Sequence, residues 1–221
     1  QIYIAGGTES MSLIPMTGYK LSPSYKANME NINYHVSMGA TAEAVAEKFN
    51  ISREAADTFS FKSHQKAANA IDQGYFEDEI VPITVEDVYV KDGKKVSNSH
   101  TVSVDEGVRR DTTIEGLSKL RAVFKQGGII TAGNASQTSD GAAFTLVMSE
   151  EKVKELGLEP QARMAACSVG GVHPLYMGIG PCEAIPKALQ QVGLQLSDIE
   201  QIELNEAFAA QALAVIQEAG L

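Results

Sequence analysis

Hydrophobic residues recur three and four positions apart in several stretches of the chain, a spacing that predicts amphipathic helices. The expected helices cover 42–49, 52–73, 112–120, 149–156, 181–192 and 208–219. Ser52 and Ser149 are residue types that cap the start of a helix, and Pro181 suits a first turn. Gly74 and Gly157 suit the position after a helix end, where a left-handed backbone is common.

Other short runs combine apolar and β-branched residues and predict strands. They cover 1–5, 79–90, 129–131, 142–148, 161–169 and 199–204. The run 142–148 is almost wholly apolar, so we expect it to be covered on both faces, and we expect the first strand to be buried as well. Pro82 has no N–H group to donate, which favours a sheet edge for 79–90.

Between these elements lie stretches without a clear period. Residues 12–37 contain Pro, Gly, Ser and Asn and are expected to form a long loop. Asp92-Gly93 predicts a turn, and 94–108 is polar and poorly periodic. In the second half of the chain, strands alternate with helices, which is typical of the α/β class. The first half carries a loop-and-helix insertion.

Composition narrows the possible classes. Hydrophobic residues make up 44% of the chain and charged residues 21%, which excludes disordered and collagen-like proteins. The net charge of -10 argues against general nucleic-acid binding, because that binding depends on Lys and Arg contacts to phosphate. Cys167 and Cys182 lack CxxC spacing and the four histidines are scattered, so we expect neither a disulfide framework nor a metal site. A reducing, cytoplasmic setting fits this cysteine usage.

Three segments have a composition that could carry chemistry, and the first is 131–136. Its residues are small and lie between two expected strands, so a ligand or another backbone could approach closely. A tight left-handed turn through Gly133 and Asn134 explains the same pattern. On these residues alone we favour the turn.

The second segment, 177–181, places two glycines before an expected helix. Free N–H groups at a helix start can bind an anion, but the pattern matches neither GxGxxG nor a P-loop, so we favour a helix-entry turn. Cys182 follows directly, at a position where the helix dipole can lower the pKa of a thiol. Cys167 lies in an apolar run and is expected to be an inert core residue.

The third segment contains Asn205, which stands where an expected strand gives way to the last helix. Asn is among the best residues for capping a helix start, which would make its role structural. Alternatively, a carboxamide at the carboxyl end of a strand points into the cleft where α/β proteins bind ligands. These residues leave both interpretations open.

Taken together, the chain resembles the thiolases, the family of acetyl-CoA acetyltransferase and 3-ketoacyl-CoA thiolase. The matching stretches are 5–12 (AGGTESMS), 38–43 (MGATAE), 51–54 (ISRE), 76–82 (FEDEIVP), 119–121 (KLR), 131–136 (TAGNAS), 177–181 (MGIGP) and 205–208 (NEAF). They follow the family order and extend from one end of the chain to the other.

The resemblance implies a layered α/β fold made of two similar βαβαβαββ halves, with a loop domain inserted in the first. Residues 1–12 would end a strand of the N-terminal half, and 13–117 would form the loop domain that covers coenzyme A. Residues 118–156 would return to the N-terminal half, and 158–221 would begin the C-terminal half.

The chemistry implied by the resemblance is acyl transfer. In the family a cysteine takes an acyl group from a thioester, a histidine activates that cysteine, and a second cysteine moves the proton at the α-carbon. Degradative members cleave 3-ketoacyl-CoA, and biosynthetic members condense two acetyl-CoA. Coenzyme A is a substrate, and no cofactor or metal is implied.

Site residues follow from the resemblance position by position. Asn205 matches the catalytic Asn that holds a water completing an oxyanion hole. Eight further residues match positions that contact the acyl, pantetheine or nucleotide part of coenzyme A. They are Met38, Arg109, Phe124, Ala132, Ser136, Met177, Ala207 and Phe208.

The family's nucleophilic Cys would lie before Gln1, and its catalytic His and second Cys after Leu221. We therefore expect this chain to be a central piece of a longer thiolase and to be inactive alone. A non-catalytic CoA-binding or subunit-interaction module is the alternative. The parent protein is expected to bind acyl-CoA and coenzyme A as a homodimer or homotetramer, with neither nucleic acid nor membrane as a partner.

Overall fold

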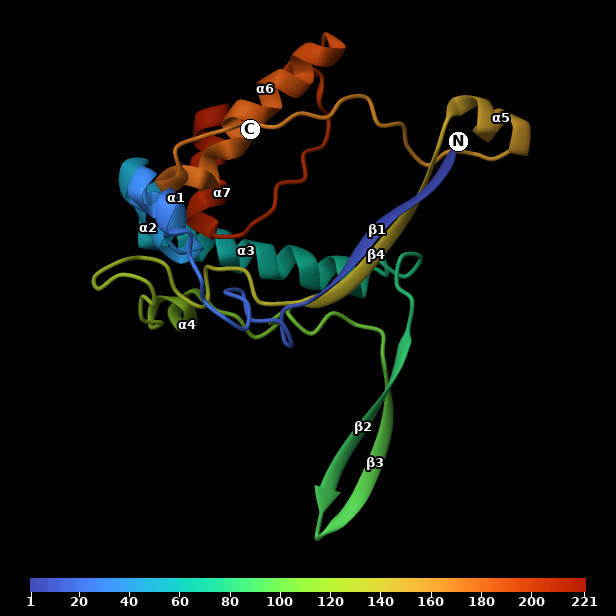
Figure 1. Cartoon of the computed structure of the whole chain (residues 1–221), viewed down its shortest axis with the longest axis horizontal. Helices are drawn as coiled ribbons and strands as arrows, with labels where there is room; N and C mark the ends of the chain where they lie inside the picture. The colour runs from blue at the N-terminus through green and yellow to red at the C-terminus, as the bar shows by residue number, and fades with distance from the viewer.

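The computed structural model describes residues 1–221 and contains a cluster of helices, two separate two-stranded sheets and one short helix, α5, at the far end of one of these sheets (Figure 1). The α-helices are α1 (Tyr25–Glu30), α2 (Met38–Lys48), α3 (Arg53–Asp72), α4 (Ile114–Ser118), α5 (Glu150–Leu156), α6 (Gly180–Val192) and α7 (Ala209–Ala219). Short 3₁₀ helices cover Ile32–His35 (η1), Pro174–Ile179 (η2) and Leu196–Asp198 (η3). The strands are β1 (Ile2–Ser10), β2 (Ile83–Lys91), β3 (Lys94–Val102) and β4 (Asp140–Met148).

Small side chains form the centre of the helical cluster. Ala42 and Ala46 of α2 pack with Ala210 of α7 and with Ile130, and all four are almost fully buried. Alanine at these positions keeps the apolar face and lets two helices approach closely, so α2, α7 and η2 pack together. α3 lies alongside, against α4 and α7.

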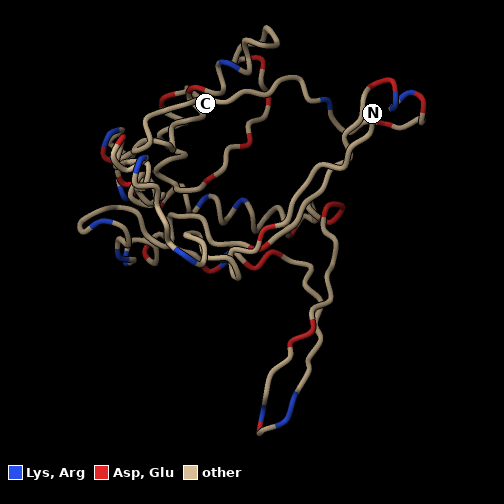
Figure 2. The backbone as a smooth tube through the Cα atoms, viewed as in Figure 1, with Lys and Arg blue, Asp and Glu red and all other residues tan.

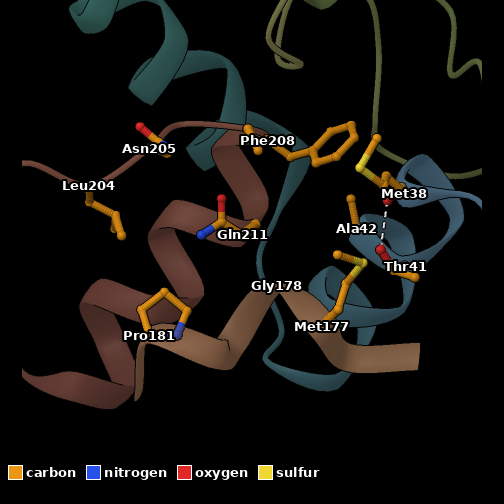
Figure 3. A pocket seen from close by; sticks show the side chains of 11 residues that line it. Met38, Thr41, Ala42, Met177, Gly178, Pro181, Leu204, Asn205, Phe208 and Gln211 are labelled. Carbon is orange, nitrogen blue, oxygen red and sulfur yellow. Dashed lines mark hydrogen bonds between the residues drawn. The ribbon is translucent and has the colours of Figure 1, made fainter. Parts of the chain in front are cut away.

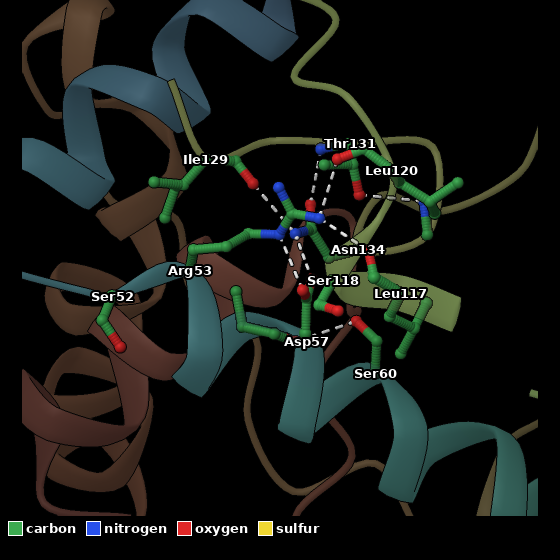
Figure 4. Close-up of polar contacts among 12 residues, drawn as sticks. Ser52, Arg53, Asp57, Ser60, Leu117, Ser118, Leu120, Ile129, Thr131 and Asn134 are labelled. Atoms are coloured by element: carbon green, nitrogen blue, oxygen red, sulfur yellow. Dashed lines mark hydrogen bonds and ion pairs between the residues drawn. The ribbon is translucent and has the colours of Figure 1, made fainter. Parts of the chain in front are cut away.

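A buried polar network joins α3 to the segment after α4 (Figure 4). Asn134 Nδ2 donates to Asp57 Oδ1 (2.9 Å) and to the Ile129 carbonyl (3.0 Å), while Asn134 Oδ1 accepts from Thr131 N (2.8 Å). Arg53 Nε donates to the other carboxylate oxygen of Asp57 at 2.7 Å. Asp57 and Asn134 are each 2% exposed, so these bonds replace the water that both groups lose.

The same arginine extends the network to α4. Its Nη2 atom donates to the carbonyls of Leu117 (2.6 Å) and Leu120 (2.9 Å), which lie at and just beyond the end of that helix. Free carbonyls at a helix C-terminus carry negative partial charge and favour a cation there. Arg53 therefore fixes α4 against α3.

A second buried carboxylate holds the neighbouring backbone. Glu43 of α2 accepts hydrogen bonds from Ile129 N (3.0 Å) and Ile130 N (2.9 Å). Because these N–H groups donate to Glu43, they are not free for a sheet. The strand predicted at 129–131 is therefore wrong, although Ile130 is buried as expected for an apolar run.

β1 and β4 form a long antiparallel ribbon in register from Ile2 opposite Met148 to Ser10 opposite Asp140. Both strands were expected, but their predicted burial is wrong, because almost every residue of the ribbon is exposed. β1 is also longer than predicted and continues through Gly6 and Gly7 to Ser10. The apolar run at 142–148 correctly predicts a strand, but no second layer of the structure covers it in this chain.

β2 and β3 form a hairpin that projects away from the helices (Figure 1). The turn predicted at Asp92-Gly93 is confirmed, and both residues have positive φ (52° and 72°), as a tight two-residue hairpin requires. The strand predicted at 79–90 begins only at Ile83, so its first part, 79–82, is wrong; Pro82, which has no N–H group to donate, directly precedes β2. β3 lies within the stretch 94–108, whose Ser, Asn and Lys residues conceal its strand character.

Three other expectations need correction. Residues 161–169 and 199–204 contain no strand, because no neighbouring strand pairs with them in this chain. The expected loop at 12–37 contains α1 and η1, which are stabilised by side-chain caps from Ser24 and Asn31. Isolated short helices of this kind lack the apolar period on which the prediction depends.

The predicted helices are confirmed, with small changes at their ends. α2 begins at Met38, earlier than expected, with Ser37 as its cap. Ser52 accepts from Ala55 N at the start of α3, as predicted, and Gly157 ends α5 in a left-handed conformation. Ser149 precedes α5 but makes no side-chain capping bond. None of the helices is long and apolar enough to cross a lipid bilayer.

We predict that Asp57→Ala lowers the free energy of unfolding of the helical cluster by about 3 kcal/mol, because it leaves Arg53 and Asn134 without a shared acceptor. Urea unfolding followed by helical circular dichroism measures the change. Gln65→Ala, at an exposed position of α3, is the matched control with a change of less than about 0.5 kcal/mol. Equal effects of the two substitutions would contradict the role of the network.

Candidate functional site

A cavity of about 220 Å³ lies between α2, η2, the start of α7 and the turn that precedes α7 (Figure 3). Most of its lining is apolar or carries only small side chains. The lining residues are Met38, Thr41, Ala42, Met177, Gly178, Pro181, Leu204, Asn205, Ala207, Phe208 and Gln211. They come from two distant stretches of the sequence, 38–42 and 177–211, so the cavity exists only because α2 packs against α7 and η2.

The start of α7 is fixed by the segment that the buried network holds. Ala209 N, the first N–H group of the helix, donates to the Asn134 carbonyl at 2.9 Å, and Ser136 N donates to the Ala207 carbonyl at 2.9 Å. Ala135 and Phe208 form the β-bridge between these hydrogen bonds. The two segments singled out in the sequence, 131–136 and 205–208, are therefore direct neighbours.

The left-handed turn favoured for Gly133 and Asn134 is wrong, because neither residue has positive φ. A side chain at Gly133 would instead collide with those of Leu117 (2.5 Å) and Leu120 (2.6 Å). Glycine thus lets the ends of these two leucine side chains pack directly against the backbone of residue 133. The sequence also allowed that the small residues let another part of the protein approach closely, and this explanation applies at Gly133.

Asn205 does not cap α7. The helix begins at Ala209, and the capping position is occupied by Phe208. Asn205 is an exposed residue at the cavity, and its side chain makes no hydrogen bond with the rest of the chain. Of the two interpretations left open by the sequence, capping is excluded; Asn205 lies at the edge of the cavity, with its side chain directed away from the other lining residues in Figure 3.

Glu206 anchors the turn that carries Asn205. Ser63 of α3 donates from Oγ to Glu206 Oε2 at 2.5 Å, and Glu206 is half-buried. Because residue 205 is held between this contact and the bridge at Phe208, its backbone is fixed from both sides.

Two aromatic rings border the cavity. Phe124 and Phe208 meet edge to face, with centroids 6.2 Å apart and ring planes at 85°. Phe124 can reach this position because residue 39 is glycine, since any Cβ there would overlap the Phe124 ring. Gly39 therefore sets the position of one ring and, through it, of the other.

Gln211 is the one buried polar group of the cavity that lacks a partner. Its side chain is 6% exposed, and its Oε1 atom accepts no hydrogen bond. Gly178 leaves room for it, because a Cβ at that position would lie 2.7 Å from Gln211 Cγ. Two methionines, Met38 (44% exposed) and Met177 (49% exposed), line the cavity as well. The site thus offers flexible thioethers around a few polar groups.

The helix dipole, which could have lowered the pKa of Cys182, does not decide it. Burial, together with the negative charge of Glu218, raises the pKa of this thiol, and Glu183 adds to the effect. Cys167 is exposed rather than part of a core. Neither cysteine lines the cavity. In addition, no three His, Cys, Asp or Glu side chains are placed to share a metal ion.

Comparison with known families finds two matching domains in the chain. Residues 1–151 match the family described as thiolase, N-terminal domain, and residues 158–221 match thiolase, C-terminal domain. The chain belongs to the thiolase family. The α/β class expected from the sequence agrees with the thiolase structures that it matches. The finer division, with a loop domain at 13–117, stays a prediction.

Relatives and solved thiolase structures cover the whole chain. It is 51% identical to the 3-ketoacyl-CoA thiolase of Bacillus subtilis over 219 aligned residues. The alignment covers 99% of this chain and 56% of that protein. The crystal structure of human mitochondrial 3-ketoacyl-CoA thiolase in complex with CoA matches 100% of the chain and 56% of its own, with 40% identity and a TM-score of 0.83. The crystal structure of the dimeric peroxisomal thiolase of Saccharomyces cerevisiae matches 100% of this chain and 54% of its own, with 41% identity and a TM-score of 0.83. The chain spans about half the length of these relatives.

The structure gathers most of the residues that the thiolase resemblance nominated. Those lining the cavity are Met38, Met177, Asn205, Ala207 and Phe208. Phe124 contacts Phe208, and Ser136 is bonded through its backbone to Ala207. Ala132 is exposed on the loop beside them.

Arg109 lies apart from the cavity. Its backbone N–H donates to His64 Nδ1 of α3 at 3.3 Å, and its side chain is exposed. The adjacent Arg110 pairs with Asp72 at 2.7 Å, and this contact lowers the pKa of that carboxyl. A ligand that reached from the cavity to Arg109 would have to be long.

The cavity residues that sequence reasoning did not nominate are Thr41, Ala42, Gly178, Pro181, Leu204 and Gln211. Gln211 had a recognisable pattern, because it is a polar residue within the apolar start of the last helix. Thr41 and Leu204 had none, since only tertiary packing brings them to the cavity.

We predict that Gln211→Leu raises the free energy of unfolding by about 1–2 kcal/mol, because it removes a buried acceptor that has no partner. Thermal or urea unfolding of the ligand-free protein measures the change. Gln217→Leu makes the same substitution at an exposed position of α7 and should change stability by less than about 0.5 kcal/mol. Destabilisation by Gln211→Leu would contradict this description of the cavity.

We also predict that iodoacetamide modifies Cys167 before Cys182 at neutral pH. The raised pKa of Cys182 keeps its thiol protonated, and its reaction should accelerate only above the ordinary thiol pKa of about 8.5. Peptide mass spectrometry of the protein sampled over time gives both rates. Faster labelling of Cys182 would show that its thiolate is stabilised instead.

Proposed function

We propose that the protein containing this chain is a thiolase-type acyl-CoA acyltransferase. It would cleave 3-ketoacyl-CoA with coenzyme A, or condense two acetyl-CoA, through an acyl-cysteine intermediate. The chain would supply the wall around the reacting thioester, with Asn205 as a catalytic residue. The observation that carries this proposal is the free carboxamide of Asn205 beside an apolar cavity.

Thioester chemistry explains why a free carboxamide matters at this place. Attack on a thioester, and removal of a proton next to it, both place negative charge on the thioester oxygen. Donors fixed in advance around that oxygen lower the barrier, because they need no reorganisation during the reaction. The amide N–H groups of Asn205 can serve directly or through a bound water, and the contacts of Glu206 and Phe208 hold its turn in place.

The walls of the cavity suit the end of an acyl-pantetheine chain. Such a chain is narrow and mostly apolar, and the methionine and phenylalanine side chains around it would exclude water. The human relative with 40% identity was crystallised with CoA, which supports the same ligand here. Coenzyme A would then be a substrate, and the mechanism needs no other cofactor.

The nucleophile must come from elsewhere. Cys182 is held as a protonated thiol, and neither cysteine of this chain lines the cavity. We propose that the acylated cysteine, the histidine that activates it and the second cysteine belong to the part of the relatives' length that this chain does not span. A chain without those groups would bind CoA but not turn it over.

Further properties of the parent protein follow as proposals. A homodimer is supported by the dimeric yeast relative, and a tetramer would be a pair of such dimers. A role in fatty-acid metabolism is supported by relatives with the name 3-ketoacyl-CoA thiolase. A cytoplasmic location is supported by two free cysteines, which suit a reducing compartment.

Asn205→Ala in the complete enzyme tests the proposal. Turnover of 3-ketoacyl-CoA should fall by roughly 10²–10³-fold with little change in KM, because the lost interaction forms mainly in the transition state. Unfolding should be unchanged, since Asn205 neither caps α7 nor bonds to the chain.

Glu203→Ala, two residues away and exposed, is the control and should retain normal turnover. Normal turnover in Asn205→Ala would remove the catalytic role. CoA binding without turnover by the complete protein would favour the alternative, a non-catalytic CoA-binding module.

A further inference from the structure

The β2–β3 hairpin offers two unpaired strand edges. It projects from the helices, and all of its strand residues except Val96 are exposed (Figure 1). Outside its own ladder, none of its backbone groups takes part in a backbone hydrogen bond. Isolated two-stranded hairpins are marginally stable in water, and free edges readily accept another strand.

Charge distinguishes the two edges. β2 carries Glu86 and Asp87 near its middle, and β3 has no charged residue between Lys95 and Val102. Two copies pairing through β2 would bring these carboxylates close to their own counterparts, which is unfavourable. β2 is therefore protected against self-pairing, whereas β3 is not.

The two ends of β3 carry opposite charge. Lys94 and Lys95 lie at the turn, where Figure 2 shows basic residues at the tip of the hairpin. Asp105 and Glu106 follow shortly after the strand ends. None of these four residues takes part in an ion pair, and Lys94 lies directly opposite another cation, Lys91.

We propose that β3 pairs antiparallel with β3 of a second copy of this chain, about a two-fold axis near His100. In this arrangement Lys94 and Lys95 of each copy meet Glu106 and Asp105 of the other, so that all four unpaired charges gain partners. A two-fold interface requires such self-complementarity. The result is a four-stranded antiparallel sheet, in which residues 103–106, a bend and the start of a turn in the single chain, extend each β3 strand on pairing.

Apolar residues of the hairpin agree with this pairing. Val96 and Val102 of β3 lie on the same face as their partners Tyr89 and Ile83 of β2. A two-fold axis perpendicular to the sheet keeps the equivalent faces of both copies on one side. The two apolar stripes therefore become one, and the association buries exposed side chains as well as backbone groups.

The net charge of -10 makes specific charge contacts necessary. Two such chains repel one another at long range, so association depends on local complementarity that outweighs the repulsion. Salt weakens both effects, and a change in salt alone would not separate them. Variants that reverse the charge at one end of β3 separate the local attraction from the long-range repulsion.

Sedimentation velocity of the complete protein over a range of concentrations tests the proposal. The double variants Lys94→Glu/Lys95→Glu and Asp105→Lys/Glu106→Lys should each weaken the hairpin-mediated association step by roughly tenfold or more. In each variant, the two ends of β3 that meet across the interface carry charge of the same sign and repel. Mixed in equal amounts, the two variants should associate as tightly as the original protein, since each supplies the charges that the other needs.

Lys20→Glu/Lys187→Glu changes net charge by the same amount at exposed positions away from the hairpin and serves as the control. Circular dichroism checks that the variants are folded, and Lys94→Glu should not harm the hairpin, because it places a carboxylate opposite Lys91. Association that is lost in each variant but restored when the two variants are mixed would establish the contact between the two β3 strands. The proposal is overturned if the mixture stays as dissociated as its components, if the variants behave like the control, or if no such step exists.

Discussion

The segment between α4 and β4 depends on buried side chains that take the place of a neighbouring strand. Glu43 and Asn134 accept its backbone N–H groups, Asp57 holds Asn134, and Arg53 balances the charge of Asp57. This segment in turn provides the acceptor for the first N–H group of α7. The position of Asn205 therefore follows from two carboxylates that are remote from it and never face the cavity.

Local information in the sequence was sufficient for the helices and for the hairpin turn. Apolar spacing and residues such as Ser52 and Gly157 act within one or two turns of the chain, so α3 and α5 could be located without tertiary contacts. Strands depend on partners. The run at 129–131 has strand composition, but its N–H groups bond to side chains, whereas polar β3 is a strand because β2 pairs with it.

The site divides in a similar way. Resemblance to a family nominated Met38, Met177 and Asn205, and folding brings these residues from distant positions to one cavity. No local pattern could show that Asn205 is free, because its capping ability depends on where α7 begins. Nor could composition locate Gln211 in the cavity or separate Arg109 from it, since both outcomes depend on how α3 and α7 pack.

The chain exposes 16494 Å² of surface, although a compact protein of this mass exposes about 10,000 Å². Much of the excess lies on the β1–β4 ribbon and the β2–β3 hairpin, whose strands pack mainly against their own partners. Elements joined to a core by so few contacts do not unfold together with it. The amide protons of the ribbon and of the hairpin will thus exchange with solvent independently of those of the helical cluster, and a single melting temperature will not describe the chain.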